Sequence, residues 1–516
     1  MNQVTDITQM LPAGFGEVQL STMFEEEQTK RSHLESRWED YAGWTLPYVF
    51  PMEGHTESLE MQTDYQSTGA KAVNALTNKL ASTLFTHSRP FFRLEVSEEM
   101  AEQAVKRGIE PADLEELTSA TEKAAMKEMD KVGLRTAILS AVRSLIVTGN
   151  SLLFLPPGGK LAQTYSLKDY IIKRNLSGED IVIITRDRKS LTALPKDLAD
   201  QVRAQGITDP DAEVSLFTGI FRTEDNRFVV KQEIDKLFVV PAQKGVYTKE
   251  NLLWIPLTWN LVRGMDYGNG LVEDYSGAFG SLSSLSESMH SLVAISADIK
   301  LLVDPMGQTD VKTLNDSPPG TAVYGSVEDV AFLQLEKQND LNFISSEMDA
   351  LKREIGQGFL IASAGQRDAE RVTTVEIERD ALELEESLGG IYSRLALELQ
   401  HPVAIRLLAS LDNNLTELEV QVITGVDALS RKSDLEAMRM LLDDLGALNV
   451  VPEDVRAWFK IGPTIKLFAA HRHVDYSSFL KSQDERDAEI AEEQAREAEL
   501  IAQEQAAKQQ GQAGPQ

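Results

Sequence analysis

Few residues of this chain have the types and spacing that catalysis would need. A phosphate-binding loop requires a glycine, four further residues and then Gly-Lys-Ser/Thr, so that backbone amides can surround the phosphates. Gly159 and Lys160 come closest, but Leu161 follows them and Phe154 occupies the position of the first glycine. The sequence also lacks a G-x-S-x-G nucleophile motif and an H-E-x-x-H zinc motif. We therefore expect neither an enzyme nor a bound cofactor.

Two pairs of polar residues are weak candidates for a metal site. His471 and His473 are the only close histidine pair, and two such imidazoles on one strand could share a metal ion. No third ligand is apparent, so solvated or core histidines explain the pair better. Asp209 and Asp211 flank a proline in a polar stretch, where a solvated turn is the better interpretation. The sequence therefore predicts no metal site.

Charged residues concentrate where one predicted helix ends and another begins. The loop 363–371 is small and polar, and it carries Gln366, Arg367 and Arg371. The helix after it starts with an acidic cluster: Glu376, Glu378, Asp380, Glu383, Glu385 and Glu386. One interpretation is a solvated helix start, whose acids suit the positive end of the helix dipole. The other is the wall of a channel, and the residues alone leave both open.

The helices on either side of this loop have narrow apolar seams. The helix before it, from Asn339, repeats apolar residues at alternating spacings of three and four: Leu341, Ile344, Met348, Leu351 and Ile355. The helix after it opens at Thr373 with Glu376 three residues on, which is a capping box. A continuous helix to His401 would be about 45 Å long, and Pro402 should kink or end it. An ordinary helical hairpin in a core would show the same pattern.

A helix of similar pattern is predicted over residues 271–303, followed by an insertion over residues 304–337. The helix keeps a seam of Leu282, Leu285, Met289, Leu292, Ser296, Ile299 and Val303. The insertion contains the turn residues Asn315, Asp316, Pro318, Pro319 and Gly320, and Val330–Leu335 is a predicted strand. Helices with such narrow seams usually pack on partners, here on each other and on neighbouring copies.

The N-terminal half combines helices with a β-rich module. Helices are predicted over Glu25–Tyr41, from Ser67 onward and over Pro111–Gly149, with a strand over Phe92–Val96. Six short β-type runs follow: Leu152–Leu155, Ile181–Thr185, Val214–Phe221, Phe228–Val230, Leu237–Val240 and Leu252–Leu257. The predicted fold class is α+β, mainly α, with two to four domains in 516 residues.

Composition narrows the possible functions further. The chain has 81 acidic and 51 basic residues, a formal charge of −30, which argues against broad binding of nucleic acid but not against letting DNA pass. Cysteine is absent, so disulfides and thiolate chemistry are excluded. No apolar run approaches the roughly 18 residues that a membrane helix needs. The N-terminus lacks a signal-peptide pattern. We expect no membrane partner, and assembly in a cytoplasm.

Several short segments, in order along nearly the whole chain, resemble the head-to-tail connector (portal) proteins of short-tailed podovirus phages. They are Thr63-Asp64-Tyr65-Gln66 with Gly69-Ala70, Val147–Leu153, Ile184–Asp187, Tyr267-Gly268 with Glu273–Tyr275, Phe332–Gln338, Glu370–Thr373 and Leu388–Tyr392. Each is short, but their ordered co-occurrence makes the resemblance specific. The extreme C-terminus matches poorly.

The resemblance implies a non-enzymatic ring, usually of twelve copies, around a DNA channel at one capsid vertex of the virion. The implied regions are the wing (1–270), first stem helix (271–303), clip (304–337), second stem helix (338–362), channel loop (363–371), long wing helix with the following segment (372–425), and crown with an acidic tail (426–516). The clip, with Asn315, Asp316, Pro318 and Pro319, would face the terminase large subunit and later the tail adaptor.

The other implied partners are double-stranded DNA and proteins of the particle. Gln366, Arg367 and Arg371 would meet the passing DNA, while Glu376, Glu378 and Asp380 would repel its phosphates. The wing and crown would face the major capsid, scaffold and internal core proteins. Two alternatives remain: a tail adaptor or other virion protein without a channel, and a packaging ATPase, which the missing phosphate-binding loop disfavours.

Overall fold

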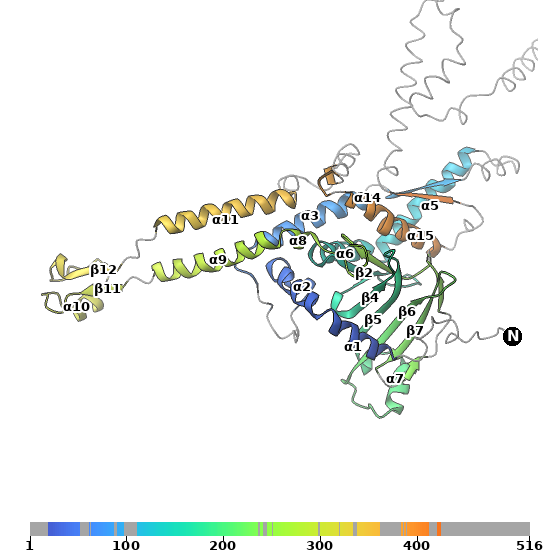
Figure 1. Ribbon diagram of the computed structural model, residues 1–516, viewed down its shortest axis with the longest axis horizontal. Coiled ribbons are helices and arrows are strands. Elements are labelled where there is room, and N and C mark those ends of the chain that lie inside the picture. Colours follow the sequence, from blue (N-terminus) through green and yellow to red (C-terminus); the bar gives the residue numbers. More distant parts are fainter. Residues whose placement is uncertain are drawn as a thin grey trace, which may run out of the picture. The chain divides into compact units, whose positions relative to one another are not determined.

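A computed structural model describes most of the chain (Figure 1). The described residues are 19–51, 61, 63–86, 90–96, 111–235, 238–240, 245–249, 251–297, 300–318, 320–333, 338–361, 383–384, 386–388, 390–411 and 420–424. The chain divides into two compact units, Met1–Glu95 with Ser119–Gly425, and Val96–Thr118 with Val426–Gln516. The first unit holds almost all of the described residues and the elements below.

The first two helices are α1 (Leu20–Lys30) and α2 (Ser32–Trp44), which meet at Arg31. The single helix expected over Glu25–Tyr41 is therefore wrong. Arg31 leaves helical geometry, and its buried guanidinium donates hydrogen bonds to the carbonyl oxygens of Leu167 at 2.7 Å and Tyr170 at 2.8 Å. These bonds fasten the junction of the two helices to the β-rich module.

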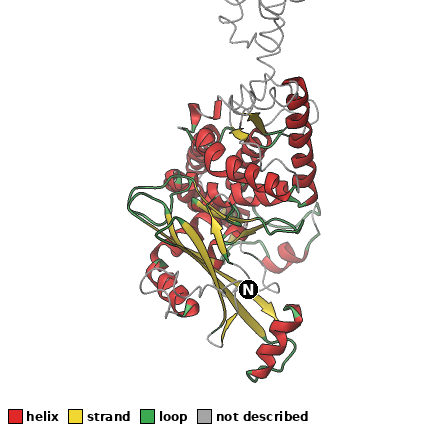
Figure 2. Cartoon of the chain, turned by 90° about the vertical axis from the view of Figure 1, so that its right-hand side faces the viewer, coloured by secondary structure: helices red, strands yellow, loops and turns green. Residues whose placement is uncertain are grey.

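Six antiparallel strands form the main sheet of that module, and its long strands run through the lower part of Figure 2. They are β4 (Tyr170–Arg174), β5 (Asp180–Ser190), β6 (Glu213–Arg222), β7 (Arg227–Ile234), β8 (Phe238–Val240) and β9 (Val246–Thr248). α1 packs on this sheet, with Leu20 and Phe24 buried against Phe217 and Phe221. The carboxylate of Glu233 on β7 accepts hydrogen bonds from the Leu20 amide and the Ser21 hydroxyl, so it caps α1 from the sheet.

The predicted β-rich module is therefore confirmed, with additions that the short runs did not predict. β3 (Gln163–Tyr165), β4 and β9 were not expected, nor was α7 (Lys196–Ala204). α7 covers one end of the sheet through Ala199 and Val202, which pack with Leu191, Val214 and Ile234. The predicted turn at Asp209 is also confirmed, because the Asp209 carboxylate accepts a hydrogen bond from the Asp211 amide at 3.1 Å.

A second sheet, ordered β10 (Trp254–Thr258), β2 (Asn150–Phe154) and β3, lies in the chain between helices that precede and follow it. The helices are α3 (Thr68–Leu84), α5 (Pro111–Lys131), α6 (Leu134–Thr148) and the short α8 (Leu271–Asp274). Gly149 ends α6 at φ 79°, where any side chain would meet the backbone of Gly268 and Asn269. The Asn150 side chain then bonds both the amide and the carbonyl of Gly268 at 2.8 Å.

The strand predicted near Phe92 is confirmed as β1 (Phe92–Val96), which pairs with β13 (Val420–Thr424), a strand that the sequence did not suggest. The described residues also include the short 3-10 segments η2 (Pro47–Val49), η3 (Leu167–Asp169), η4 (Leu191–Ala193) and η5 (Val327–Asp329).

The single helix expected from Thr373 to His401 is interrupted. Gly390 adopts φ 87°, which a right-handed helix does not allow. α14 (Ile391–Leu395), the π-helical η7 (Ala396–Gln400) and α15 (His401–Ser410) then follow one another. Pro402 lies in the first turn of α15, where its missing amide is tolerated, so it does not end the helix. Residues 362–382 lie outside the described part of the chain.

The carboxyl of Asp180, at the start of β5 in the main sheet, allows a test of its environment through the pH dependence of stability. Burial raises the pKa of its carboxyl to about 6, although Arg174 at 2.6 Å opposes the shift. Because this folded pKa is above the unfolded value, the associated stability is present below pH ~4 and is lost as pH rises through ~6. Between these pH values, the free energy of unfolding of the wild type should fall by roughly 2 kcal/mol relative to Asp180→Asn. Urea titrations at a series of pH values measure it.

Asp209→Asn, at an exposed turn, is the matched control and should follow the wild type. Parallel pH profiles for the wild type and Asp180→Asn would contradict the raised pKa of the Asp180 carboxyl.

Candidate docking site at the end of a helical hairpin

Two long antiparallel helices form a hairpin: α9 (Ser276–Ala297) and α11 (Gln338–Gly358) lie side by side (Figure 1). Both predicted helices are confirmed, and so are their seams from Leu282 to Leu292 on α9 and from Leu341 to Ile355 on α11. Leu282 on α9 and Ile355 on α11 are fully buried, and the other described seam residues are half-buried: Leu285, Met289, Leu292, Leu341, Ile344, Met348 and Leu351. The seams therefore pack helix against helix within one copy.

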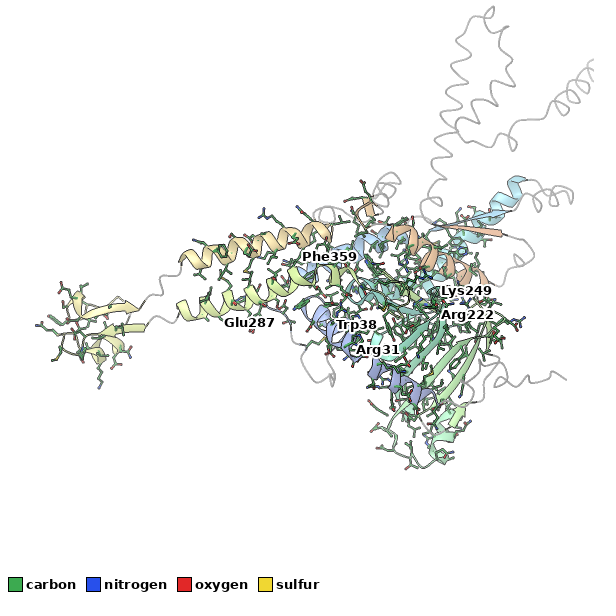
Figure 3. The ribbon with its side chains drawn as sticks, in the orientation of Figure 1. Arg31, Trp38, Arg222, Lys249, Glu287 and Phe359 are labelled. Carbon is green, nitrogen blue, oxygen red and sulfur yellow. The ribbon has the colours of Figure 1, made fainter. Side chains whose placement is uncertain are left out.

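The base of the hairpin is closed by aromatic packing. Phe359, which follows α11 and is labelled in Figure 3, is fully buried and packs edge-on against Tyr275 and Phe279 with ring centroids 5.5 and 5.6 Å apart. Gly358 lies directly against the ring of Tyr275, where a Cβ atom would overlap it. Both helices are thereby fixed to each other where they join the rest of the first unit.

One of the resembling segments also holds the hairpin. The Ser283 hydroxyl on α9 donates a 2.6 Å hydrogen bond to Asp64, and the ring of Tyr65 lies 6.0 Å from that of His290. Gln66 bonds the Trp44 carbonyl at 2.6 Å and thus ties the segment to α2. These residues position α9 rather than perform chemistry.

The segment after the undescribed loop has its own attachment to the core. Lys79 on α3 is buried, and its ammonium lies 2.8 Å from the carboxylate of Glu383. Leu384 next to it is fully buried. An ion pair with one buried member is costly to break, so it fixes where the chain re-enters the described structure.

Residues 300–333 form a small module between the two helices. β11 (Lys300–Val303) pairs antiparallel with β12 (Val330–Leu333). The expectation that the first helix continues to Val303 is wrong, because α9 ends at Ala297 and Val303, the last seam residue, lies in strand β11. The run Leu301-Leu302-Val303 suits either structure, and its pairing with β12 decides between them. We call residues 300–333 the tip module.

Hydrogen bonds to Asp329 and Thr309 hold the tip module together. One carboxylate oxygen of Asp329 accepts from the Gln308 amide at 2.7 Å, the Thr309 amide at 3.1 Å and the Thr309 hydroxyl at 3.0 Å. The Thr309 hydroxyl oxygen also accepts from the Ser326 amide at 3.0 Å. The module is thus organised by polar contacts.

The predicted docking residues lie on the surface of the tip module. Asn315 and Asp316 end the short helix α10 (Val311–Asp316), and Pro318 follows; all three are exposed. Asp310 caps α10, and hydrogen bonds from Thr313 and from the Lys312 amide lower the pKa of its carboxyl. Pro319 lies outside the described residues.

The sequence did not single out the apolar surface of the tip module. Met306, Tyr324 and Val327 are 93%, 98% and 93% exposed, and Leu302 and Val311 are more than half exposed. An available signal was their position among turn residues, because Tyr324 precedes Gly325 and Met306 precedes Gly307. The module also carries five acids and two lysines, a net charge of −3. It therefore presents an acidic surface with isolated apolar side chains.

The remaining predicted site residues cannot be placed. Gln366, Arg367, Arg371, Glu376, Glu378 and Asp380 all lie outside the described part of the chain, as do His471 and His473. Glu383 is described and pairs with Lys79, and Glu386 is exposed.

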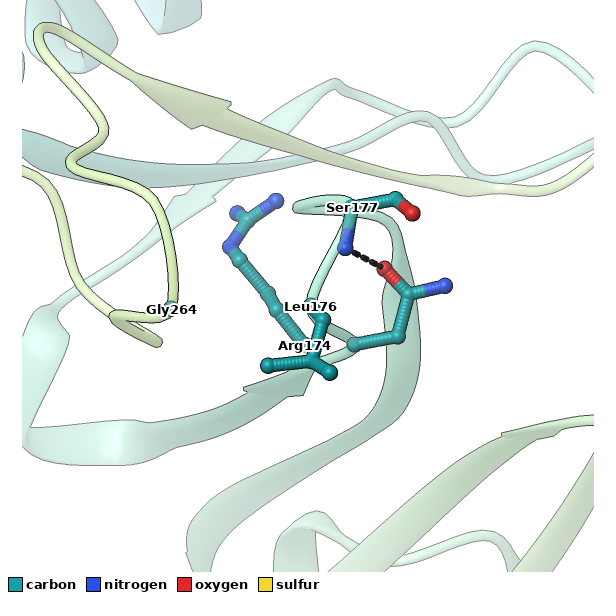
Figure 4. A pocket seen from close by; sticks show the side chains of 5 residues that line it. Arg174, Leu176, Ser177 and Gly264 are labelled. Atoms are coloured by element: carbon teal, nitrogen blue, oxygen red, sulfur yellow. Dashed lines mark hydrogen bonds between the residues drawn. The ribbon is translucent and has the colours of Figure 1, made fainter.

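The described residues offer no catalytic arrangement. A shallow pocket of about 470 Å³ between two loops is lined by Arg174, Asn175, Leu176, Ser177 and Gly264 (Figure 4). Its polar groups serve the turn itself, since Asn175 accepts from the Ser177 amide at 2.9 Å. Among the described residues, no group of three His, Asp or Glu side chains could hold a metal ion. Nor does any described helix have the length and apolar character needed to cross a membrane.

The close packing at the hairpin base predicts that a side chain at position 358 lowers the free energy of unfolding. Gly358→Ala should destabilise the protein by roughly 1–3 kcal/mol, because the new methyl group must displace the ring of Tyr275. Gly356→Ala, two residues away with only a 4.0 Å contact to Ile361, is the matched control. It should be neutral or stabilising by up to about 1 kcal/mol, since alanine favours helix. Urea unfolding compares them, and equal effects would contradict the packing.

Comparisons with known proteins identify the family of this chain. Residues 17–466 match the family model described as "Bacteriophage head to tail connecting protein". The chain is 32% identical to the portal protein of Enterobacteria phage SP6 over 94% of each chain, and 31% identical to that of Escherichia phage T7 over 93% of this chain and 91% of the relative. A chain from the virion of a native gene transfer agent particle aligns with 79% of this chain, and 90% of its own length, at 10% identity and a TM-score of 0.36. By its family match and its identity to these relatives, the chain belongs to the bacteriophage head to tail connecting proteins, and its function is that of a portal protein.

Proposed function

We propose that copies of this chain assemble head to tail into a closed ring, of twelve copies, whose central channel passes double-stranded DNA during packaging and ejection. The support is the α9–α11 hairpin, which carries the tip module at one end and leads toward the loop 363–371 at the other. Neighbouring copies in a closed ring bury surfaces that stay exposed in one copy. Phe343 on α11, 71% exposed, and Val293 on α9, 50% exposed, are two such surfaces.

The regions of the chain would then have separate tasks. The wing would comprise residues 1–270, the two stem helices α9 and α11, and the clip the tip module. The segment 372–425 would return to the wing, and residues 426–516 would form the crown. Wing and crown would face the major capsid protein, the scaffold and internal core proteins. In this proposal the protein is a structural component of the virion, assembled in the host cytoplasm and without catalytic activity.

The tip module would dock the terminase large subunit and later the tail adaptor. Asn315, Asp316, Pro318 and Pro319 would contribute to this surface. The exposed Met306, Tyr324 and Val327 extend it, because exposed aromatic and sulfur-containing side chains are typical anchors of protein interfaces. The net charge of −3 favours a basic surface on the partner.

The loop 363–371 would line the channel. Arg367 and Arg371 would touch phosphates transiently, with Gln366 beside them, and such contacts carry no sequence preference. Glu376, Glu378 and Asp380 would keep the wall negative and repel DNA. A wall of this kind suits a protein of net charge −30 that must move DNA without holding it.

Native mass spectrometry over a range of concentration and salt tests the ring. The wild type should give a closed oligomer, and a variant with Asn315–Gly320 replaced by a short Gly-Ser linker should give the same oligomer but fail to bind terminase or adaptor. Only monomers or dimers of the wild type would refute the ring. Failure of the variant alone to assemble would show that the tip module belongs to the assembly core.

Arg367→Ala combined with Arg371→Ala tests the channel loop. The double variant should form rings normally but package or retain DNA less well, because two phosphate contacts are lost. Quantification of packaged DNA and infectivity measures the effect. Lys196→Ala combined with Arg203→Ala, two exposed cations on α7 and outside the tip module, is the control of equal charge change. Normal packaging and infectivity of the channel double variant would refute the role.

A further inference from the structure

Arg406, on α15, has no partner for its charge within the described chain. Its side chain is half-buried, and its Nε atom is sealed from solvent without a hydrogen-bond acceptor. Burial lowers the pKa of Arg406 to about 10, and Tyr247 is the one group that opposes the shift. A guanidinium carries five donors in a fixed plane, so leaving it desolvated without an anion is costly. Such an arrangement indicates that an acceptor is supplied from elsewhere.

Three acids that the structure describes on η7 and at the start of β5 already have partners. Each already has an arginine of its own: Glu398 with Arg394 at 3.0 Å, Glu179 with Arg222 at 2.7 Å, and Asp180 with Arg174 at 2.6 Å. Arg394 also donates a hydrogen bond to the Thr258 hydroxyl at 3.0 Å, so the Arg394–Glu398 pair is attached to β10. Arg222, the last residue of β6, and Lys249, which follows β9, are further cations (Figure 3). Among the residues that the structure describes, this part of the unit thus has several cationic groups, while the acids Glu398, Glu179 and Asp180 are already paired.

We propose that Arg406 is an intersubunit anion site that receives a carboxylate from the neighbouring copy of this chain. The inference rests on the ring proposed above and assigns one of its contacts. Head-to-tail packing brings different faces of identical chains together, so an acid exposed on one face can reach a cation on the other. With 81 acids against 51 bases, the chain offers many such carboxylates. The same net charge of −30 disfavours a DNA phosphate as the usual ligand.

Arg406→Met gives opposite effects on the single chain and on the ring. Methionine keeps the apolar stem and removes an unpaired charge, so the urea midpoint of the monomer should be unchanged or higher. The ring loses one charge-assisted contact per interface, so its assembly midpoint should move to at least about tenfold higher protein concentration. Arg406→Lys, which keeps the charge but loses the planar fork, should be intermediate. Mass photometry over a dilution series and urea unfolding of dilute protein measure the two quantities.

Two arginines provide matched controls. Arg394→Met removes a guanidinium with internal partners and should lower the monomer midpoint. Arg203→Met removes an exposed one on α7 and should change neither quantity. If rings persist at every dilution, urea-driven release of subunits, followed by native mass spectrometry, replaces the assembly midpoint, and Arg406→Met rings should release subunits at lower urea.

The other outcomes overturn the inference. A lower monomer midpoint for Arg406→Met would mean that the partner lies within the chain. Unchanged ring formation or release would mean that no neighbouring carboxylate binds there, and reduced duplex binding by otherwise normal rings would identify a phosphate as the ligand instead. A wild type that never forms rings would refute the proposed function, which is a distinct result.

Discussion

The packing of Phe359 between Tyr275 and Phe279 is the contact on which the functional half of the molecule depends. It fixes the end of α11 against the start of α9, so the two helices leave the core with one register. In sequence, the tip module connects the end of α9 to the start of α11, and the segment that leads toward Glu383 begins after α11. A change of register between the two helices at this base would shift the tip module and that segment. This explains why Gly358 must lack a side chain: the helix can approach Tyr275 closely only there.

The segments that carry the resemblance to phage connectors have structural tasks where they are described. Asp64 bonds Ser283 and thereby holds α9, while Gly149 and Asn150 close tightly on the backbone around Gly268. Glu273 pairs with Arg37 and links α8 to α2. These residues therefore fix elements of the described chain against one another.

Sequence periodicity predicted the helices well and their ends poorly. Seams at three and four spacing identified α9 and α11, because helix-on-helix packing requires that pattern. The errors lie where a distant contact decides the local conformation. Arg31 breaks the first helix to reach the carbonyls of Leu167 and Tyr170, and Leu301–Val303 become a strand by pairing with β12. At Gly390 a flexible residue permitted a break that spacing alone could not reveal.

The candidate docking surface was predicted only in part for a similar reason. Turn residues located the tip module and named Asn315, Asp316 and Pro318, which are exposed. The apolar residues Met306, Tyr324 and Val327 were overlooked, because an isolated apolar residue in a turn-rich segment can lie either in a small core or on the surface. Exposure, which only the fold gives, reverses that interpretation.

The tip module is too small to be stable through a core of its own. Among the tip-module side chains for which the structure gives an exposed fraction, only Thr309 is buried. A 34-residue segment also falls below the size at which hydrophobic burial usually suffices for stable folding. Its order therefore depends on the Asp329 hydrogen bonds and on the two helices that enclose it in sequence. Contacts that cover Met306, Tyr324 and Val327 would add the apolar burial that the module lacks. If the tip module docks a partner as proposed, binding of that partner would be thermodynamically coupled to ordering of the module.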